Sequence, residues 1–268
     1  MRLFRVVLQE VKLLLIVAIL AQFSSGAVAA EPTPSGKSPK FRVVAIAEAA
    51  SIHRPFVAAA KVWLNEQAAK DNFVVDYLEN TDHINDDFLS RYQVFIQLDY
   101  PPYGWTPTAQ AAFVRYIEEG RGGWIGFHHA TLLGEFDGYP IWPWFSEFMG
   151  GIRFKSYIPT FADAEVKVED GTHPVMKGVS EQFEVFHEEW YAWDKSPAPN
   201  VHVLASVDEQ SYKPDSNIKM GGSHPVIWSN ERYKARNVYI FMGHHADHFQ
   251  NKAYTTIFRN ALFWAAHQ

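Results

Sequence analysis

The sequence predicts an α/β protein, a three-layer sandwich built around a mostly parallel sheet with antiparallel additions in its C-terminal half. Up to about residue 150, short apolar runs rich in β-branched residues alternate with longer segments of helical periodicity. This alternation is typical of parallel strands joined by right-handed helical crossovers. After Gly150, strand-like runs follow one another with few helical stretches between them, which favours antiparallel pairing there.

The first half provides parallel strands and two helices. Pro55 is expected to open a helix that runs to about Lys70, because proline suits the first helical turn. A second amphipathic helix is expected over 108–119, and the glycines that follow it end it. The strands of this half are expected over 41–47, 74–78, 94–98 and 124–127.

The second half provides the remaining strands and a closing helix. The last segment, 251–267, has apolar residues spaced for one buried helical face. No internal repeat is present, so a single domain over 41–268 accounts for the pattern. The strands of this half are expected over 164–168, 201–206, 225–228 and 237–242.

The N-terminus has the pattern of an export signal. Basic residues precede an apolar stretch over 13–23, and the small-residue run Ala27-Val28-Ala29-Ala30 follows, so 1–30 is expected to be a signal peptide. A retained N-terminal anchor is the alternative, although the apolar core is shorter than the about 20 residues that span a membrane. Residues 31–40 form a Pro- and Ser-rich linker. A periplasmic or secreted protein without a stable membrane span after cleavage is expected.

Composition narrows the chemistry. The chain has no cysteine, which excludes disulfides, thiol nucleophiles and thiolate metal sites. Its net charge is −6 and it has no run of Lys and Arg, so nucleic acid is not an expected partner. Aromatic residues in loop-like stretches, including Tyr103, Trp105 and Trp142, suit the stacking of a sugar ring. The alternative for these rings is that they cover a core.

Histidines cluster just after predicted strands. His128 and His129 follow one strand, and His244 opens a second cluster that also contains His245 and His248. Ligands bind beyond the carboxyl ends of strands in open α/β sheets, and imidazole binds metals and exchanges protons near neutral pH. The alternatives are exposed loop residues or histidines bonded to backbone at the sheet end. His128 stands at a sharp turn after a strand, called the elbow, where α/β enzymes with a nucleophile carry Ser or Cys. An imidazole at this position argues against nucleophilic acyl transfer.

Two further patterns extend these clusters. In a strand His187 and Glu189 would share a face while Glu188 points away, and a carboxylate beside an imidazole can complete a metal shell or orient a base. His244 and His248 could share one helical face, although no H-E-x-x-H motif is present. His53, in the loop after the first strand, is the expected partner from another part of the chain.

The order and spacing of these landmarks resemble the trehalose-utilisation (ThuA-like) family over essentially all of the chain after the linker. The resemblance implies a flavodoxin-like or class I glutamine amidotransferase-like fold. Two departures are Glu188 where the family commonly has Asp, and a second histidine, His129, after the elbow. The matching landmarks are His53, the Gly-Gly-x-x-Gly-x-His element over 122–128, His173-Pro174-Val175, Glu188-Glu189-Trp190-Tyr191, Pro225-Val226-Ile227-Trp228, Gly243-His244 and Phe263-Trp264-Ala265-Ala266.

The resemblance implies the use of trehalose or a related disaccharide, and in some members the hydrolysis of 3-keto-glycosides. We expect an exported carbohydrate-active hydrolase or lyase with a small carbohydrate substrate and one zinc-like divalent ion. The alternative is a non-catalytic protein that binds a sugar or a partner; oligomeric state stays open. The expected site residues are His128, Glu189 and His53 for catalysis, His53, His128 and His244 for the metal, and Tyr103, Trp105, Trp142, His129 and Trp190 for the substrate.

Overall fold

The computed structural model describes residues 38–49 and 52–267, and all of them belong to one compact unit. The expected signal peptide over 1–30 and most of the linker over 31–40 lie outside the described residues, so both stay predictions. Within the described ranges, no helix has the length and apolar character needed to cross a membrane.

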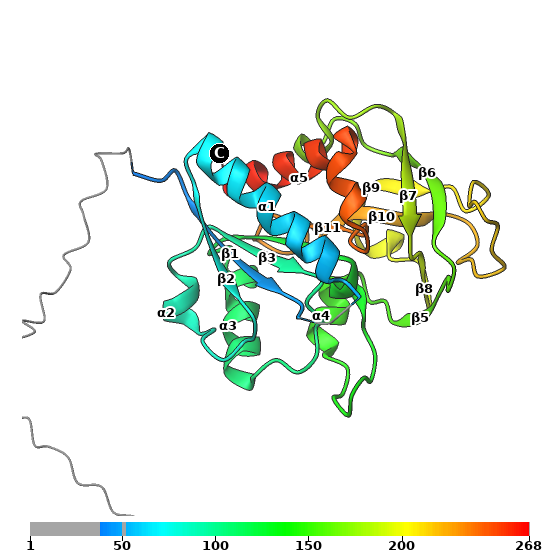
Figure 1. The fold of residues 1–268 in the computed structure, drawn as a ribbon. Coiled ribbons are helices and arrows are strands. Elements are labelled where there is room, and N and C mark those ends of the chain that lie inside the picture. Colours follow the sequence, from blue (N-terminus) through cyan, green and yellow to red (C-terminus); the bar gives the residue numbers. More distant parts are fainter. Residues whose placement is uncertain (1–37, 50–51, 268) are drawn as a thin grey trace, which may run out of the picture. The chain divides into compact units, whose positions relative to one another are not determined.

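A nine-stranded sheet forms the middle layer, in the order β2-β1-β3-β4-β11-β10-β9-β6-β7 (Figure 1). The strands from β2 to β11 in this order pair in parallel, and the strands beyond β11 pair antiparallel, as expected for the two halves of the chain. The strands are β1 (Arg42–Ala47), β2 (Val74–Leu78), β3 (Val94–Leu98), β4 (Gly123–Phe127), β6 (Ala162–Val168), β7 (Gln182–Glu188), β9 (His202–Val207), β10 (His224–Ser229) and β11 (Asn237–Ile240), while β5 (Phe154–Tyr157) and β8 (Tyr191–Trp193) form a separate pair.

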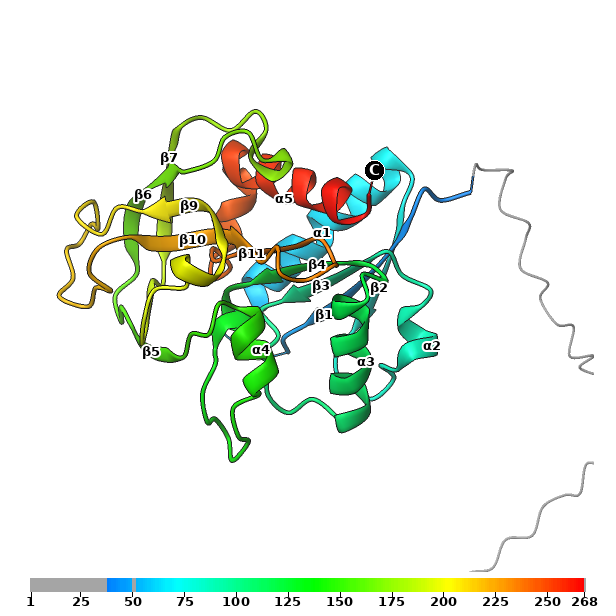
Figure 2. The same cartoon turned by 180° about the vertical axis from the view of Figure 1, so that it is seen from behind.

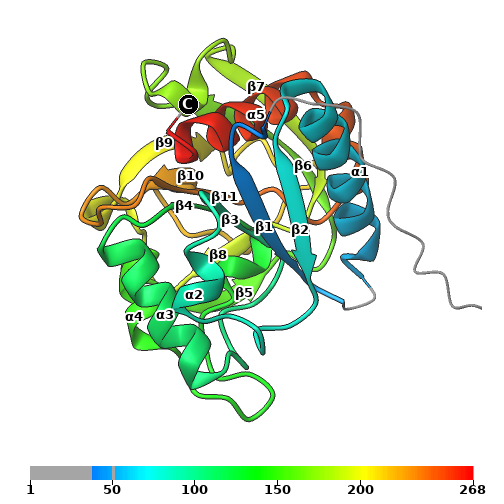
Figure 3. The same cartoon turned by 90° about the vertical axis from the view of Figure 1, so that its left-hand side faces the viewer.

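Helices cover both faces of the sheet, which confirms the three-layer sandwich. Helices α1 and α5 lie on one face and α2, α3 and α4 on the other (Figures 2 and 3). The helices are α1 (Arg54–Asp71), α2 (Asp86–Leu89), α3 (Pro107–Glu118), α4 (Pro143–Phe148) and α5 (Lys252–Ala265), and short 3₁₀ turns are η1 (His128–Thr131), η2 (Pro174–Met176), η3 (Ala198–Asn200) and η4 (Ala246–Gln250).

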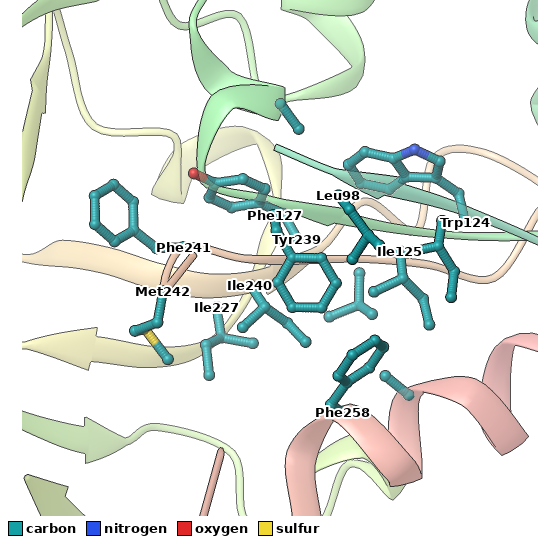
Figure 4. Packing of buried hydrophobic residues seen from close by; sticks show 14 of the residues in the cluster. Leu98, Trp124, Ile125, Phe127, Ile227, Tyr239, Ile240, Phe241, Met242 and Phe258 are labelled. Atoms are coloured by element: carbon teal, nitrogen blue, oxygen red, sulfur yellow. The ribbon is translucent and has the colours of Figure 1, made fainter. Parts of the chain in front are cut away.

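The core lies between the central strands and the helices on each face. Every residue of β3 and β4 is buried, as expected of strands covered on both faces. Figure 4 shows Phe127 of β4 and Ile240 of β11 beside Phe258 of α5, and the rings of Phe127 and Phe258 meet edge to face at 4.7 Å. Full burial of such side chains stabilises the fold by roughly 1.5–3 kcal/mol each.

Two glycines at the passage from α3 to β4 are required for different reasons, the approach of α5 to Gly123 and the left-handed backbone at Gly120. A Cβ at Gly123 would lie 2.5 Å from the carbonyl oxygen of Ala265, and Gly120 has a φ of +70°. The predicted end of α3 at this run is confirmed for these reasons. The sequence analysis did not predict α2, α4, β5 or β8, because elements of three to six residues are too short to show a period. It also did not include β7 among the expected strands, although it considered a strand conformation around His187.

Candidate functional site

The carboxyl ends of the parallel strands lie together at one end of the sheet, which is called the parallel edge below. Polar residues follow the strands there. Glu48, Asp99 and His128 come directly after β1, β3 and β4, and His244 follows β11. Asp99 and His128 have φ values of +52° and +33°, in the left-handed region that few non-glycine residues adopt. They meet over Gly243, where a Cβ would lie 2.6 Å both from Oδ1 of Asp99 and from Cβ of His128.

Four of the expected site residues converge at this edge: His53, His128, Glu189 and His244. One ligand atom from each lies within 4.8 Å of the others. Nε2 of His128 lies 3.4 Å from Oε2 of Glu189, and Nε2 of His244 lies 4.0 Å from the same oxygen. The expected convergence is therefore observed, while the chemical roles of the four residues stay predictions.

The imidazoles of this cluster are buried without the hydrogen bonds that buried polar groups normally form. His53 and His128 are fully buried, and His244 is 5% exposed. Among the described residues, both ring nitrogens of His53 and of His128 lack a hydrogen-bond partner, as does Nδ1 of His244. Each unpaired group costs about 1–3 kcal/mol. Such a concentration of unpaired nitrogens is typical of a ligand site rather than of a structural core.

A carboxylate supports His53 from the outer side. Oε2 of Glu48 lies 2.9 Å from Nδ1 of His53 and 3.0 Å from Nδ1 of His129. Both contacts are as short as hydrogen bonds, although the ring nitrogens are poorly aligned with the carboxylate oxygen. Burial raises the pKa of Glu48, but the neighbouring His129 and His53 together lower it to about 2. Glu48, His53 and His129 also form a second group whose ligand atoms lie within 4.8 Å of one another.

Glu188 is a fully buried carboxylate that ties the cluster to the loop after β11. Its Oε2 accepts hydrogen bonds from Nε2 of His248 at 2.7 Å and from the backbone of Gly243 at 3.1 Å. Its Oε1 lies 3.6 Å from Nδ1 of His128. Burial raises the pKa of Glu188, but the hydrogen bond from His248 lowers it to about 2. Glu188 therefore stays ionised beside the ring of His128.

The expectation that His187 and Glu189 share a face while Glu188 points away is wrong. The pairing of β6 with β7 shifts between Ala162 opposite Glu188 and Ala164 opposite Val185, so β7 carries a bulge there. His187 lies in that bulge with a φ of +54°. The extra residue turns His187 outward and Glu188 inward.

His244 and His248 do not share one ligand set either. The segment that carries His248 is the 3₁₀ turn η4, which begins after His244, so the i, i+4 spacing of an α-helix does not apply. His248 pairs with Glu188 instead.

Burial separates the protonation preferences of the cluster. Burial raises the pKa of Glu189 despite the opposing effect of His244, so Glu189 holds a proton more readily than Glu188. Burial also lowers the pKa of His128 well below its ordinary value and lowers that of His244, so both imidazoles are neutral, the form that binds metals. Two adjacent carboxyl groups with opposite shifts are typical of acid/base centres.

The donor set fits a zinc-like divalent cation. Zinc takes imidazole nitrogens and carboxylate oxygens at about 2.0–2.2 Å, so its ligand atoms lie at most roughly 4 Å apart. The atoms from His53, His128 and His244 lie within 4.8 Å of one another and would close by a fraction of an ångström, with the carboxyl group of Glu189 beside them as the proton donor. Glu48 beside His53 matches the carboxylate partner that metal-binding imidazoles usually have.

Two of the expected substrate-binding rings belong to the core. Trp105 and Trp142 are 5% and 9% exposed, and their rings contact each other at 5.5 Å. Both also pack on Phe113 of α3, and Nε1 of Trp105 donates to the carbonyl oxygen of Pro101. The expectation that they stack a sugar is therefore wrong, because they seal the layer between the sheet and helices α3 and α4.

Trp190 is likewise unable to touch a substrate. It is fully buried, stacks on Phe241 at 5.4 Å, and donates from Nε1 to the carbonyl oxygen of Ala162. Tyr103 is half-buried and stacks on Tyr139. Burial, Asp137 and the charge of Glu48 raise the pKa of Tyr103 to about 12. The charge of Glu48 therefore reaches Tyr103, and the substrate-binding role of Tyr103 stays a prediction.

The sequence analysis missed three carboxyl groups of this site: Glu48, Asp99 and Glu188. The position of Glu48 and Asp99 directly after strands could have revealed them, since the same argument selected His128. Asp99 is fully buried, burial raises its pKa well above the ordinary value, and neither oxygen has a hydrogen-bond partner among the described residues. Glu188 had no such signal, because its direction depends on the bulge in β7.

Comparisons with known proteins agree with the fold. The family model described as trehalose utilisation (ThuA) matches residues 42–265. A ThuA-like protein from Bacteroides uniformis is 29% identical with a TM-score of 0.75, and the match covers 88% of this chain and 95% of that one. No functionally curated protein matches the chain.

More distant solved structures share the fold alone. A ThuA-like protein from Parabacteroides merdae is 18% identical with a TM-score of 0.59, covering 85% of this chain and 90% of that one. A GMP synthase protein from Thermoplasma acidophilum is 11% identical with a TM-score of 0.50, covering 85% and 94% respectively. The amidotransferase-like fold expected from the sequence is therefore confirmed.

Proposed function

The chain belongs to the trehalose-utilisation (ThuA) family, and on that basis we propose that it is an exported hydrolase or lyase acting on a trehalose-like glycoside or 3-keto-glycoside. His53, His128 and His244 hold one zinc-like divalent cation, and Glu189 transfers the proton. The observation that carries this proposal is the convergence of three buried imidazoles and one carboxyl group at the carboxyl end of the parallel strands.

The two neighbouring carboxyl groups take different parts in the reaction. Glu189, whose pKa is raised, protonates the glycosidic oxygen as the bond to it breaks. The resulting carboxylate then accepts a proton, from water in hydrolysis or from the carbon beside a keto group in elimination. Glu188, whose pKa is about 2, stays ionised and places its negative charge 3.6 Å from Nδ1 of His128. A divalent cation bound to the imidazoles would polarise a keto or hydroxyl oxygen of the sugar.

Metal content and turnover of the full chain test this proposal together. We expect close to one zinc-like ion per chain, and release of glucose from trehalose or from 3-ketotrehalose that stops with a chelator and returns with the metal. A protein without metal that still turns over either sugar would disprove the metal part. A protein that binds metal and sugar without turnover would establish the non-catalytic alternative.

A further inference from the structure

We infer that a cavity beside the candidate centre binds the second sugar ring of a disaccharide substrate. This inference rests on the proposed function and names the place where that substrate lies. The cavity has a volume of about 490 Å³, within the range of small-molecule sites. It offers a surface for the sugar that the buried Trp105 and Trp142 cannot provide. It is lined by Glu184, Phe186, His187, Asp247, Gln250 and Asn251.

Strand β7 gives the cavity an exposed aromatic ring and an exposed imidazole. It is the last strand of the sheet (Figure 1), and its residues Phe183 and Val185 are buried. Phe186 continues this alternation outward and is 46% exposed, and the bulge turns the next residue, His187, outward as well. Together with Phe161, which is 38% exposed, Phe186 provides apolar surface that a ligand can cover.

A series of ring contacts connects this cavity with the candidate centre. Phe161, itself 38% exposed, lies 4.6 Å from the ring of His244 and 5.0 Å from that of His245. The ring of His245 lies 5.9 Å from that of His187, which lines the cavity. We therefore place one sugar ring at Glu189 and His244 and the second beyond Phe161 and His245, in the part of the cavity that His187 lines.

The polar groups of the cavity select a neutral polyol. Glu184 and Asp247 are exposed, and neither forms an ion pair within the part of the chain that the structure describes. Carboxylates accept hydrogen bonds from sugar hydroxyls and repel anions such as phosphates. An aromatic ring between such acceptors suits the C–H face of a pyranose.

Titration of trehalose and of zinc into the full chain and its variants tests this inference. Phe186→Ala is expected to weaken trehalose binding about tenfold, and Asp247→Asn about threefold, with zinc binding unchanged. Both side chains are exposed, so both variants should fold. Tyr157→Ala is the matched control, because Tyr157 is an aromatic residue of equal exposure, 45%, on β5 away from the cavity lining. It should bind trehalose as the wild type does.

The inference is overturned if both cavity variants bind trehalose within twofold of the wild type, or if the wild type binds no trehalose. An equal loss in Tyr157→Ala would also overturn it. The proposed function is judged separately by His128→Asn: if that variant keeps its zinc and its turnover, the catalytic centre is wrong, whereas the Phe186 result still decides the sugar cavity.

Discussion

Two regions of the protein each contain a buried histidine beside a glutamate, and the two pairs differ in their hydrogen bonds. In the antiparallel half, Nδ1 of His224 lies 3.0 Å from Oε1 of Glu209, and the two oxygens of Glu209 accept backbone N–H groups of Met220 and Gly221 at 2.7 and 3.0 Å. At the parallel edge, Oε2 of Glu48 lies 2.9 Å from Nδ1 of His53, and among the described residues both ring nitrogens of His53 lack a hydrogen bond, whereas at His224 only Nε2 does.

The difference separates a structural pair from a ligand site. Glu209 holds the loop before β10 through its hydrogen bonds. Burial raises the pKa of Glu209, but His224 and the backbone N–H groups together lower it by more, so the pKa lies below its ordinary value. The residues at the parallel edge carry unpaired nitrogens, left-handed backbone at Asp99 and His128, and carboxyl groups with opposite pKa shifts. Strain and unpaired polar groups that persist in a folded protein mark functional sites more often than cores do.

The largest expected effect is on turnover, at His128. His128→Asn suits the positive φ at this position, because asparagine tolerates the left-handed region. Turnover of the sugar substrate should fall by about 10²–10⁴-fold, since a general acid/base or metal contact is lost. Bound metal should fall with it, as measured by elemental analysis. Normal turnover in the folded variant would remove the distinction between the two regions.

The next effect concerns acid stability in metal-free protein. Glu48 has a pKa of about 2 against an ordinary value of 4.5, so its stabilising contribution is complete above pH 4.5 and is lost as the pH falls towards 2. The integrated loss is about 3 kcal/mol. Glu48→Gln should flatten this part of the curve of unfolding free energy against pH, measured by urea titration with a chelator. An acid limb identical to that of the wild type would contradict the pairing with His53 and His129.

A smaller effect is expected at Gly243. Gly243→Ala places a Cβ 2.6 Å from Asp99 and from His128, so one of them must move. The free energy of unfolding should fall by about 1–3 kcal/mol, and turnover should fall as well. Gly171→Ala is the control, because the nearest atom to its new Cβ would be 3.9 Å away. Equal thermal melting of the two variants would show that the contact over Gly243 is not tight.

The smallest effect on activity is expected at the structural pair. His224→Asn removes the imidazole that contacts Glu209 and Tyr212, so the unfolding free energy should fall by about 1–3 kcal/mol. Turnover per folded molecule and bound metal should match the wild type. A loss of turnover comparable to that of His128→Asn would mean that both regions serve the reaction.

Local sequence patterns were sufficient to predict the fold class and the place of the site. Periodic apolar runs located β1 to β4, the long helices α1, α3 and α5, and strands β6, β9, β10 and β11 of the second half, because strand and helix periods are properties of local sequence. Histidines after strands pointed to the parallel edge, where the parallel topology brings His128 and His244 together, whereas Glu189 reaches them from the end of the antiparallel strand β7.

Long-range packing set which side chains face that edge. The bulge in β7 exchanged the directions of His187 and Glu188, and packing against α3 buried Trp105 and Trp142, which the sequence could place only in loops. Contacts between residues far apart in the chain, such as Glu188 with His248 or Glu48 with His129, leave no local pattern. Local periodicity fixes where an element forms, whereas burial, pairing and protonation depend on which distant elements pack against it.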